Sequence, residues 1–200
     1  MLKAFLHKDE VEAGCDEAGR GCLAGPVVAA AVIMPKDWNH KILNDSKKLT
    51  EKARLLLRAI IEKEAVSYAV SFVDHHEIDE INILNASFTA MHRAVDQLST
   101  KPEHLLIDGN RFNKYQGIQH SCIIKGDAKF VSIAAASILA KTYRDEFMMK
   151  LHSEFPAYSW NSNKGYPTKA HRQAIIQHGP CHYHRQTFRL YPLPEQKTLF

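Results

Sequence analysis

Residues 15–33, CDEAGRGCLAGPVVAAAVI, place two acids and a glycine-rich turn in front of a wholly apolar segment. Val27–Ile33 predicts a buried strand, because it is rich in Val and Ala and contains no polar residue. Residues 13–17 predict the end of an earlier, short strand. Three glycines between the two segments allow the backbone to turn sharply. The stretch therefore predicts a strand, a turn poor in side chains, and a second strand inside the protein.

The composition is typical of one globular domain spanning residues 1–200. Of the 200 residues, 45% are hydrophobic and 24% are charged, which is enough for a sizeable core. The longest apolar run, 23–34, contains Pro26 and is too short to span a bilayer. The N-terminus turns acidic before an apolar signal segment can form. We therefore expect a cytoplasmic protein without membrane association, and a monomer.

The four cysteines show no CxxC pair, so free thiols are expected rather than disulfides. The cluster of residues 181–184, CHYH, lacks the second ligand pair that structural zinc sites use.

Helical and strand-like segments alternate along the rest of the chain. Helices are predicted at 51–65, with Thr50 as N-cap, at 78–98, and at 132–151, whose first half is nearly all apolar. Strands are predicted at 66–73, 104–108 and 121–125. The apolar positions at helical spacing are Leu55, Leu56, Ala59 and Ile60 in the first helix and Ile81, Leu84, Phe88, Met91 and Val95 in the second. This alternation predicts an α/β fold.

Acidic residues stand where several apolar strands end. They are Asp16, Glu17, Asp108 and Asp127. Asp before Gly is also ordinary turn chemistry, which would explain any one of them alone. Carboxylates gathered at adjacent strand ends repel one another and favour a hard divalent cation, Mg²⁺ or Mn²⁺. Two such ions can activate a water and stabilise the leaving oxygen in phosphodiester cleavage.

Asp16 and Glu17 are consecutive, and consecutive side chains of a regular strand point to opposite faces. Both reach one ion only if the strand breaks at Glu17, and the glycines that follow would allow this. We therefore expect a break in the strand at that residue.

Residues 155–194 contain no Asp or Glu and alternate basic with aromatic side chains. This composition is typical of a groove that neutralises phosphates and stacks on sugars or bases, although a solvated basic face has a similar composition. We expect a C-terminal helical subregion packed on the α/β core. Lys47 and Lys48, just before a helix start, add a further position suited to anions.

The chain resembles the ribonuclease HII family through short segments that occur in order over nearly its whole length. They are GCDEAGRG at 14–21, DSKKL at 45–49, INILNASFTAMHRAV at 81–95, IDGN at 107–110, KGD at 125–127, IAAASILAKTYRD at 133–145, KGYPTKAH at 164–171 and HRQTF at 184–188. The resemblance implies an RNase H-like core, in which helices flank a central mixed sheet, with a helical C-terminal part.

The resemblance also implies an endonuclease for RNA/DNA hybrids and for duplex DNA that carries a single ribonucleotide. The cut would fall on the 5′ side of the ribonucleotide and leave 3′-hydroxyl and 5′-phosphate ends. By motif, the acids that would hold Mg²⁺ or Mn²⁺, two ions with substrate bound, are Asp16, Glu17, Asp108 and Asp127. The residues that would touch substrate are Gly19, Arg20, Gly21, Lys47, Lys48 and Tyr166. The GRG turn would read the 2′-hydroxyl, and Tyr166 would press on the sugar of the next deoxynucleotide.

Asp145 is a rival for the fourth acid. Because it lies in mid-helix beside Arg144, an ion-pairing role on the helix surface is a simpler interpretation of this residue than a role as metal ligand. We therefore prefer Asp127.

The last residues, QKTLF, resemble the QxxLF peptide by which bacterial repair and replication proteins dock on the sliding clamp. Gln196, Leu199 and Phe200 occupy the specified positions, and the two apolar residues would anchor an extended terminus in a pocket. The alternative is a tail that packs on its own domain.

Two other functions stay open on the sequence alone. One is a different two-metal nuclease or strand-transfer enzyme on the same type of core, and the other is a non-catalytic nucleic-acid-binding domain. The GRG turn beside Asp16 and the segment around Tyr166 favour the ribonucleotide endonuclease over the first. Acids at several strand ends disfavour the second, because uncompensated carboxylates weaken phosphate binding.

Overall fold

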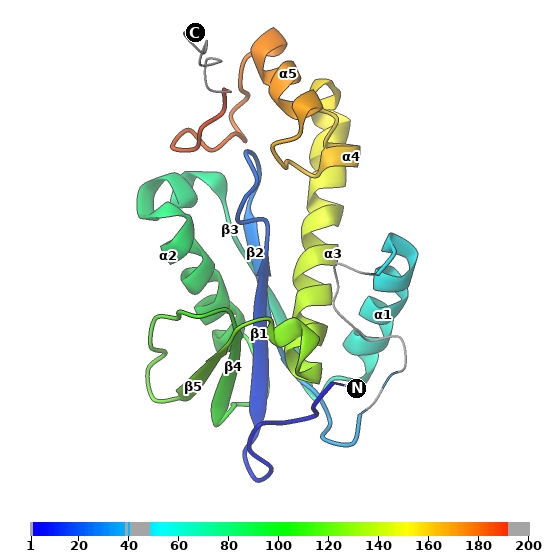
Figure 1. Cartoon of the computed structure of the whole chain (residues 1–200), viewed down its shortest axis with the longest axis vertical. Helices are drawn as coiled ribbons and strands as arrows, with labels where there is room; N and C mark the ends of the chain where they lie inside the picture. Colours follow the sequence, from blue (N-terminus) through cyan, green and yellow to red (C-terminus); the bar gives the residue numbers. More distant parts are fainter. Residues whose placement is uncertain (1, 39, 41–48, 192–200) are drawn as a thin grey trace, which may run out of the picture.

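A computed structural model describes residues 2–38, 40 and 49–191, and its centre is a mixed five-stranded sheet (Figure 1). The strands follow the order β3-β2-β1-β4-β5 across the sheet. Their bounds are Glu12–Ala18 for β1, Val27–Ile33 for β2, Ser67–Val73 for β3, His104–Asp108 for β4 and Gln119–Ile123 for β5. Because β1 pairs antiparallel with β2 and parallel with β4, the predicted mixed sheet is confirmed.

The wholly apolar sequence of β2 is explained by burial on both faces of the sheet. Ala29 and Ala31 belong to one buried cluster, and Ala30 and Val32 belong to another on the opposite face. A strand covered on both faces needs apolar side chains at every position, in contrast to the alternating pattern of a half-exposed strand.

The predicted strand break at Glu17 is wrong. β1 continues to Ala18 and stays paired with β2 up to that residue. On its other side, pairing of β1 with β4 ends at Cys15, and β4 itself ends at Asp108. Asp16 and Glu17 therefore lie beyond the last residue of β1 that pairs with β4. A regular strand can thus present both acids at the open end of the sheet.

Helices cover both faces of the sheet, α2 on one and α1 with α3 on the other (Figure 1). The bounds of the helices are Glu51–Glu64 for α1, His75–Asp96 for α2, Val131–Glu154 for α3, Trp160–Asn163 for α4 and Lys169–His178 for α5. The predicted helices at 51–65, 78–98 and 132–151 are confirmed, with ends that differ by at most three residues. The first half of α3 is buried throughout, as its apolar sequence predicts.

The buried face of α1 differs from the predicted apolar positions. Thr50 caps the helix as predicted, and its side chain accepts a hydrogen bond from the Ala53 N–H. Leu57 and Ile61 are buried, whereas Leu55 and Leu56 are 51% and 53% exposed. The helix contacts the core through a narrow stripe formed by these two residues, which are one turn apart at positions i and i+4. The local sequence does not show which apolar residues form this stripe.

The predicted C-terminal helical subregion is present and packs on the end of the sheet near the start of β2 (Figure 1). Leu23, Met148 and Leu151 join it to the core in a third buried cluster. Trp160 and Arg185 belong to the basic and aromatic stretch, yet both are fully buried. Part of the composition predicted to form a nucleic-acid groove is therefore internal packing.

No helix within the described residues is long and apolar enough to cross a membrane. All four cysteines are free, as expected. Lys47, Lys48 and the QKTLF tail at 196–200 lie outside the described residues.

Candidate active site

A cleft of about 430 Å³ opens where β1 and β4 end. All predicted site residues that the structure describes line this cleft, with the exception of Asp127. They are Asp16, Glu17, Gly19, Arg20, Gly21, Asp108 and Tyr166. The structure therefore brings together residues from β1, the turn after it, β4 and the C-terminal subregion.

Burial and the neighbouring acids in this cleft, Glu17 and Asp108, raise the pKa of Asp16. Burial is the main cause that raises the pKa of Asp16 well above its ordinary value, and the charges of Glu17 and Asp108 raise it further. Hydrogen bonds from the Ser137 side chain and from the Glu17 N–H, 2.7 Å from Asp16 Oδ1, oppose this effect. A divalent cation would relieve the repulsion, and oxygen donors are the ligands that hard cations prefer. The residues present therefore fit a Mg²⁺ or Mn²⁺ site.

Asp127 and Asp145 occupy different surroundings. Asp127 is buried in a short 3-10 turn, Gly126–Ala128, and the N–H of Gly126 donates to Asp108 Oδ1 at 2.7 Å. Asp145 forms an ion pair with Lys141 at 2.7 Å and lines a separate pocket between α1 and α3. The turn that carries Asp127 is thus attached to a cleft acid, whereas Asp145 is paired with a cleft cation, Lys141.

The two glycines of the GRG turn differ in their surroundings. Gly19 has φ +97°, and a Cβ there would lie 2.0 Å from Nε of Arg144. Gly21 has nothing within 4 Å of the position of a Cβ, and it lines the cleft. Internal packing therefore explains why residue 19 is a glycine, but it does not explain why residue 21 is one.

Two buried arginines hold the segment 19–26 in place through its carbonyl groups. Arg185 donates to the carbonyls of Gly19, Arg20 and Gly25 at 2.8–3.0 Å. Arg144 donates in the same way at 2.8–3.1 Å, to Ala24, Pro26 and Lys164. Burial lowers the pKa of Arg185 to about 10, so its guanidinium stays charged at neutral pH. The segment 19–26 is thus held at its first part by the C-terminal subregion and at its last part by both α3 and that subregion.

Tyr166 belongs to the same hydrogen-bonded unit as the turn. Its neighbour Gly165 accepts a hydrogen bond from the Leu23 N–H at 2.8 Å, and its own carbonyl accepts one from His171 Nδ1 at 2.9 Å. The ring is 38% exposed at the cleft and lies 5.6 Å from Lys141 Nζ. The backbone of Tyr166 is therefore fixed while its ring faces the cleft.

Comparisons with known proteins agree with this arrangement. The sequence model of the family described as Ribonuclease HII matches residues 13–191. The chain belongs to the ribonuclease HII family. The Ribonuclease HII of Bacteroides thetaiotaomicron is 68% identical over 190 residues, which cover 95% of each chain. Membership of this family makes the protein a ribonuclease H-type endonuclease that acts on RNA/DNA hybrids.

Solved structures share the fold of this ribonuclease HII. The ribonuclease H2 from Pyrococcus horikoshii OT3 matches with a TM-score of 0.74 and 27% identity, over 90% of this chain and 94% of that one. The RNase HII from Archaeoglobus fulgidus, solved as a complex with PCNA, matches with a TM-score of 0.72 and 24% identity, over 92% and 98%. The RNase H-like core predicted from the sequence is therefore confirmed.

Several cleft residues of this ribonuclease HII were not predicted as site residues. Arg54 and Lys141 line the cleft and add positive charge beside the acids. One layer behind the cleft, Arg185 binds the carbonyls of the turn, and Arg144 binds the carbonyls of Ala24 and Pro26 just after it. Lys141, Arg144 and Arg185 lie inside the family segments IAAASILAKTYRD and HRQTF, so those segments were the available signal. Only the folded structure shows which carbonyl groups the two arginines bind.

Proposed function

We propose that this ribonuclease HII also cuts duplex DNA at a single embedded ribonucleotide, on its 5′ side, and leaves 3′-hydroxyl and 5′-phosphate ends. One observation carries the proposal: the acids suited to metal and the GRG turn line the same cleft. A group that contacts a 2′-hydroxyl next to the site of hydrolysis selects the junction between RNA and DNA, because only RNA carries that hydroxyl. This activity serves the removal of ribonucleotides from DNA.

In this proposal Asp16, Glu17, Asp108 and Asp127 hold two Mg²⁺ or Mn²⁺ ions. When bound, such ions supply an activated water and neutralise charge on the leaving oxygen. Asp16 and Asp108 are close enough for one charge to shift the pKa of the other, which supports a shared ion. Gly126, adjacent to Asp127, donates to Asp108, and this contact supports Asp127 as the fourth acid over Asp145.

The orientation of the GRG turn supports a contact between its backbone N–H groups and the ribose. The carbonyls of Gly19 and Arg20 accept hydrogen bonds from buried Arg185. In a planar trans peptide the C=O and the following N–H point in opposite directions. The N–H groups of Arg20 and Gly21 therefore point away from Arg185, and we assign to them the hydrogen bonds to the 2′-hydroxyl oxygen.

The remaining predicted contacts complete the proposed substrate path. The half-exposed ring of Tyr166 packs on the sugar of the deoxynucleotide that follows the ribonucleotide. A second cleft of about 250 Å³ shares Glu17, Arg20 and Asp108 with the first and adds Arg111, which suits a neighbouring phosphate. Lys47 and Lys48, outside the described residues, are proposed as further phosphate contacts.

We also propose that the tail docks on a sliding clamp through Gln196, Leu199 and Phe200. The RNase HII of Archaeoglobus fulgidus was solved with PCNA, which supports a clamp as partner for this chain. The QxxLF pattern at the C-terminus supports the tail as the docking segment.

The test compares a duplex with one ribonucleotide, an RNA/DNA hybrid and an all-DNA duplex, with and without Mg²⁺. We expect one Mg²⁺-dependent cut 5′ of the ribonucleotide, with an upstream product that a polymerase can extend from its 3′-hydroxyl. Asp16→Asn abolishes both RNA-dependent cuts. Asp127→Asn reduces them strongly, and Asp145→Asn serves as the matched control for the rival acid.

Two outcomes would contradict the proposal in different ways. Cutting of the hybrid without cutting at a single ribonucleotide would refute the junction specificity and leave the family activity intact. Binding of all three duplexes without any cut in Mg²⁺ or Mn²⁺ would favour a non-catalytic nucleic-acid-binding protein.

A further inference from the structure

A second cluster of potential metal ligands lies at the opposite end of the sheet from the cleft. Within residues 2–38, 40 and 49–191, one group of three His, Cys, Asp or Glu side chains has ligand atoms within 4.8 Å of one another: His7, Glu10 and His104. His104 is the first residue of β4, and the cleft acid Asp108 is the last. They are four positions apart along the strand, which is about 13 Å, so the two sites do not share a ligand.

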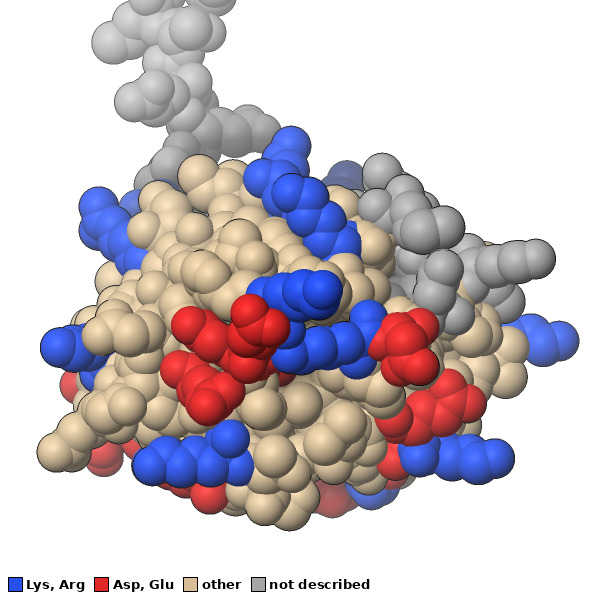
Figure 2. Space-filling model, turned by 90° about the horizontal axis from the view of Figure 1, so that it is seen from below, with Lys and Arg blue, Asp and Glu red and all other residues tan. Residues whose placement is uncertain are grey.

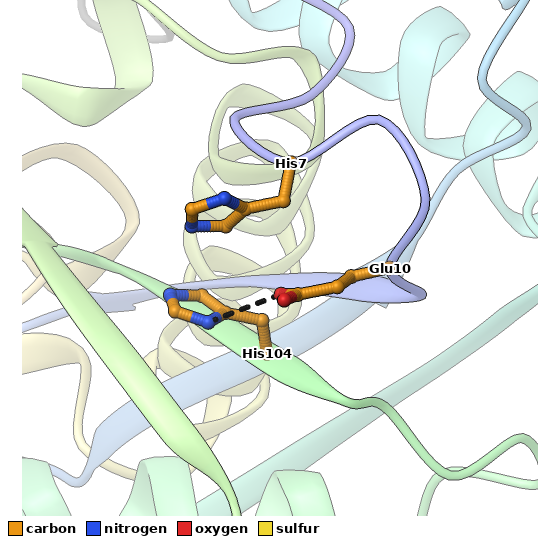
Figure 3. A group of neighbouring side chains, drawn as sticks. All are labelled: His7, Glu10 and His104. Carbon is orange, nitrogen blue, oxygen red and sulfur yellow. Dashed lines mark ion pairs between the residues drawn. The ribbon is translucent and has the colours of Figure 1, made fainter.

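The spacing of these groups matches a tetrahedral transition-metal site. Figure 3 shows the two imidazole rings and the Glu10 carboxylate gathered in one place, with Glu10 Oε2 at 3.3 Å from His104 Nδ1. Ligands about 2.0–2.1 Å from a tetrahedral ion lie about 3.3 Å from one another. His7 is exposed, so its ring can move the small remaining distance toward the other two.

The hydrogen bonds around the cluster also suit a metal. Nε2 of His104 lies 2.9 Å from the Ser121 hydroxyl oxygen, and an Nε2–H that donates there leaves the Nδ1 lone pair facing Glu10. Metal-bound histidines usually fix their tautomer by such a bond from the other ring nitrogen. Glu10 Oε2 is buried and accepts no hydrogen bond from the described residues, and its ion-pair partner among them is the His104 ring. A buried carboxylate oxygen opposite a lone pair is stabilised by a cation between them.

The backbone holds the three ligands together before any ion binds. Glu12, the first residue of β1, accepts hydrogen bonds from the N–H groups of Leu6 and His7 at 2.6–3.2 Å. The N–H of His104 donates to the Val11 carbonyl at 3.3 Å, which places Glu10 beside β4. The N-terminal segment is therefore folded back on the start of β4, with His7 and Glu10 facing His104.

The surface charge at this end disfavours a large anion as the ligand. Figure 2 views the molecule from below, the end where β1 and β4 begin, and shows Asp and Glu side chains interspersed with Lys and Arg. A surface of mixed sign attracts a phosphate backbone weakly. A small cation held by specific side chains suits it better.

We propose that His7, Glu10 and His104 form a binding site for a divalent transition-metal ion of the Zn²⁺ class, completed by water. Two imidazoles and one carboxylate suit Zn²⁺ better than Mg²⁺, which prefers an all-oxygen shell. The ion cross-links the N-terminal segment to β4 and stabilises the fold at a distance from the reacting atoms. This proposal is independent of the one made for the cleft.

The test measures Zn²⁺ binding by calorimetry and thermal unfolding in millimolar Mg²⁺, which occupies the oxygen donors of the cleft. We expect one equivalent of Zn²⁺ to bind and to raise Tm by roughly 5–10 °C when free Zn²⁺ is a hundred times Kd. Both His7→Ala and Glu10→Gln weaken binding at least tenfold and reduce the rise in Tm at the same free Zn²⁺ to about half or less. Because His7 is exposed, His7→Ala keeps the metal-free Tm and the Mg²⁺-dependent activity of the parent.

Two control variants separate this site from other ligands. His178→Ala removes an exposed histidine at the end of α5, and Cys181→Ser removes the thiol that lies 3.3 Å from His184 Nδ1. Both are expected to bind Zn²⁺ like the parent. The proposal is overturned if the parent binds no Zn²⁺, if binding survives in both His7→Ala and Glu10→Gln, or if Cys181→Ser alone loses it.

Discussion

At the scale of single residues, the GRG turn allows a matched pair of substitutions. Gly21→Ala places a methyl group in the cleft and meets no protein atom, so stability should change by no more than about 0.5 kcal/mol. On the proposed binding mode, the methyl group would displace the ribose from the backbone N–H groups, and a displacement of this size would reduce kcat/KM on the order of 100-fold. Cutting assays and urea unfolding of the same preparation measure the two effects.

Gly19→Ala is expected to lower the stability of the fold, in contrast to Gly21→Ala. The residue has φ +97°, and its new methyl group would collide with Arg144, so the strain costs about 1–3 kcal/mol. Equal loss of stability in the two variants would refute the distinction between an internally constrained glycine and one that faces substrate.

The acids and the turn could be predicted from the sequence because each lies in a short motif with local chemistry. The role of Arg185 could not, since arginine is rarely buried without a paired charge and a basic stretch suggests a surface. The pairing of His7 with His104 was equally hidden, because 97 positions separate the two residues and only the packing of β1 beside β4 brings them together.

At the scale of elements, the C-terminal subregion depends on a pair of neutral histidines. His171 Nε2 accepts a hydrogen bond from Trp160 Nε1 at 3.0 Å and lies 3.2 Å from His184 Nε2. Burial, followed by the charge of His171, lowers the pKa of His184 to about 4, and burial also lowers the pKa of His171. Since His171 holds the Tyr166 carbonyl, this pair supports the edge of the cleft.

Acid should therefore weaken the fold in a defined pH window. The pKa of His184 is lower in the folded chain than in the unfolded chain, about 6.5, so the unfolded state takes up the proton first as pH falls. The free energy of unfolding should be nearly constant above about pH 7 and fall by about 1.4 kcal/mol by pH 5.5 through His184, with a further loss in the same direction from His171. Urea unfolding at pH 7.5, 6.5 and 5.5 measures this, and an unchanged midpoint across the series would contradict it.

Arg185→Lys tests whether the subregion positions the turn. Lysine cannot reach all three carbonyls that Arg185 binds, and each buried carbonyl left without a donor costs about 1–3 kcal/mol. We expect lower stability and a higher KM for the ribonucleotide duplex, with Mg²⁺ binding retained because the acids do not contact Arg185. Arg189→Lys, an exposed change in the same segment, is the control, and equal behaviour of the two variants would exclude the positioning role.

The bounds of strands with a plain apolar sequence were predicted to the residue. Features that depend on contacts with other parts of the chain were not predicted. Val27–Ile33 and His104–Asp108 are short apolar runs with clear limits, so their predicted bounds are confirmed. In α2, Asn82 has φ +66° and kinks the helix, and its side chain accepts a hydrogen bond from the Leu84 N–H at 3.0 Å. The expected break at Glu17 was unnecessary because β4 ends early and opens the sheet beside both acids.

At the scale of the whole molecule, deletion of residues 196–200 separates docking from catalysis. The described cleft contains no residue after Tyr166, so kcat/KM on a free oligonucleotide duplex should not change. Binding to a sliding clamp should be lost, because Leu199 and Phe200 supply the apolar anchors. Surface plasmon resonance on immobilised clamp measures this. Lys197→Ala with Thr198→Ala changes only the unspecified positions and should bind normally; unchanged binding by the deletion would remove the tail from the proposal.

The prediction of one domain over residues 1–200 stays a prediction, but the cleft already depends on distant parts of the chain. β1 and the turn contribute early residues, β4 contributes Asp108, and the C-terminal subregion contributes Tyr166. The short motifs were sufficient to name these residues. Their meeting follows from the parallel pairing of β1 with β4 and from the third buried cluster.

The attachment of the turn to Arg185 also sets an order in time during synthesis. The ribosome makes the chain from the N-terminus, so Asp16, Glu17 and the turn emerge first, and Arg185 follows 166 residues after Gly19. For most of its synthesis the nascent chain therefore carries the cleft acids without the side chain that binds the carbonyls of the GRG turn. If the turn reads the ribose as proposed, substrate selectivity is acquired last, and a chain cut short before Arg185 would lack the contacts that fix the turn.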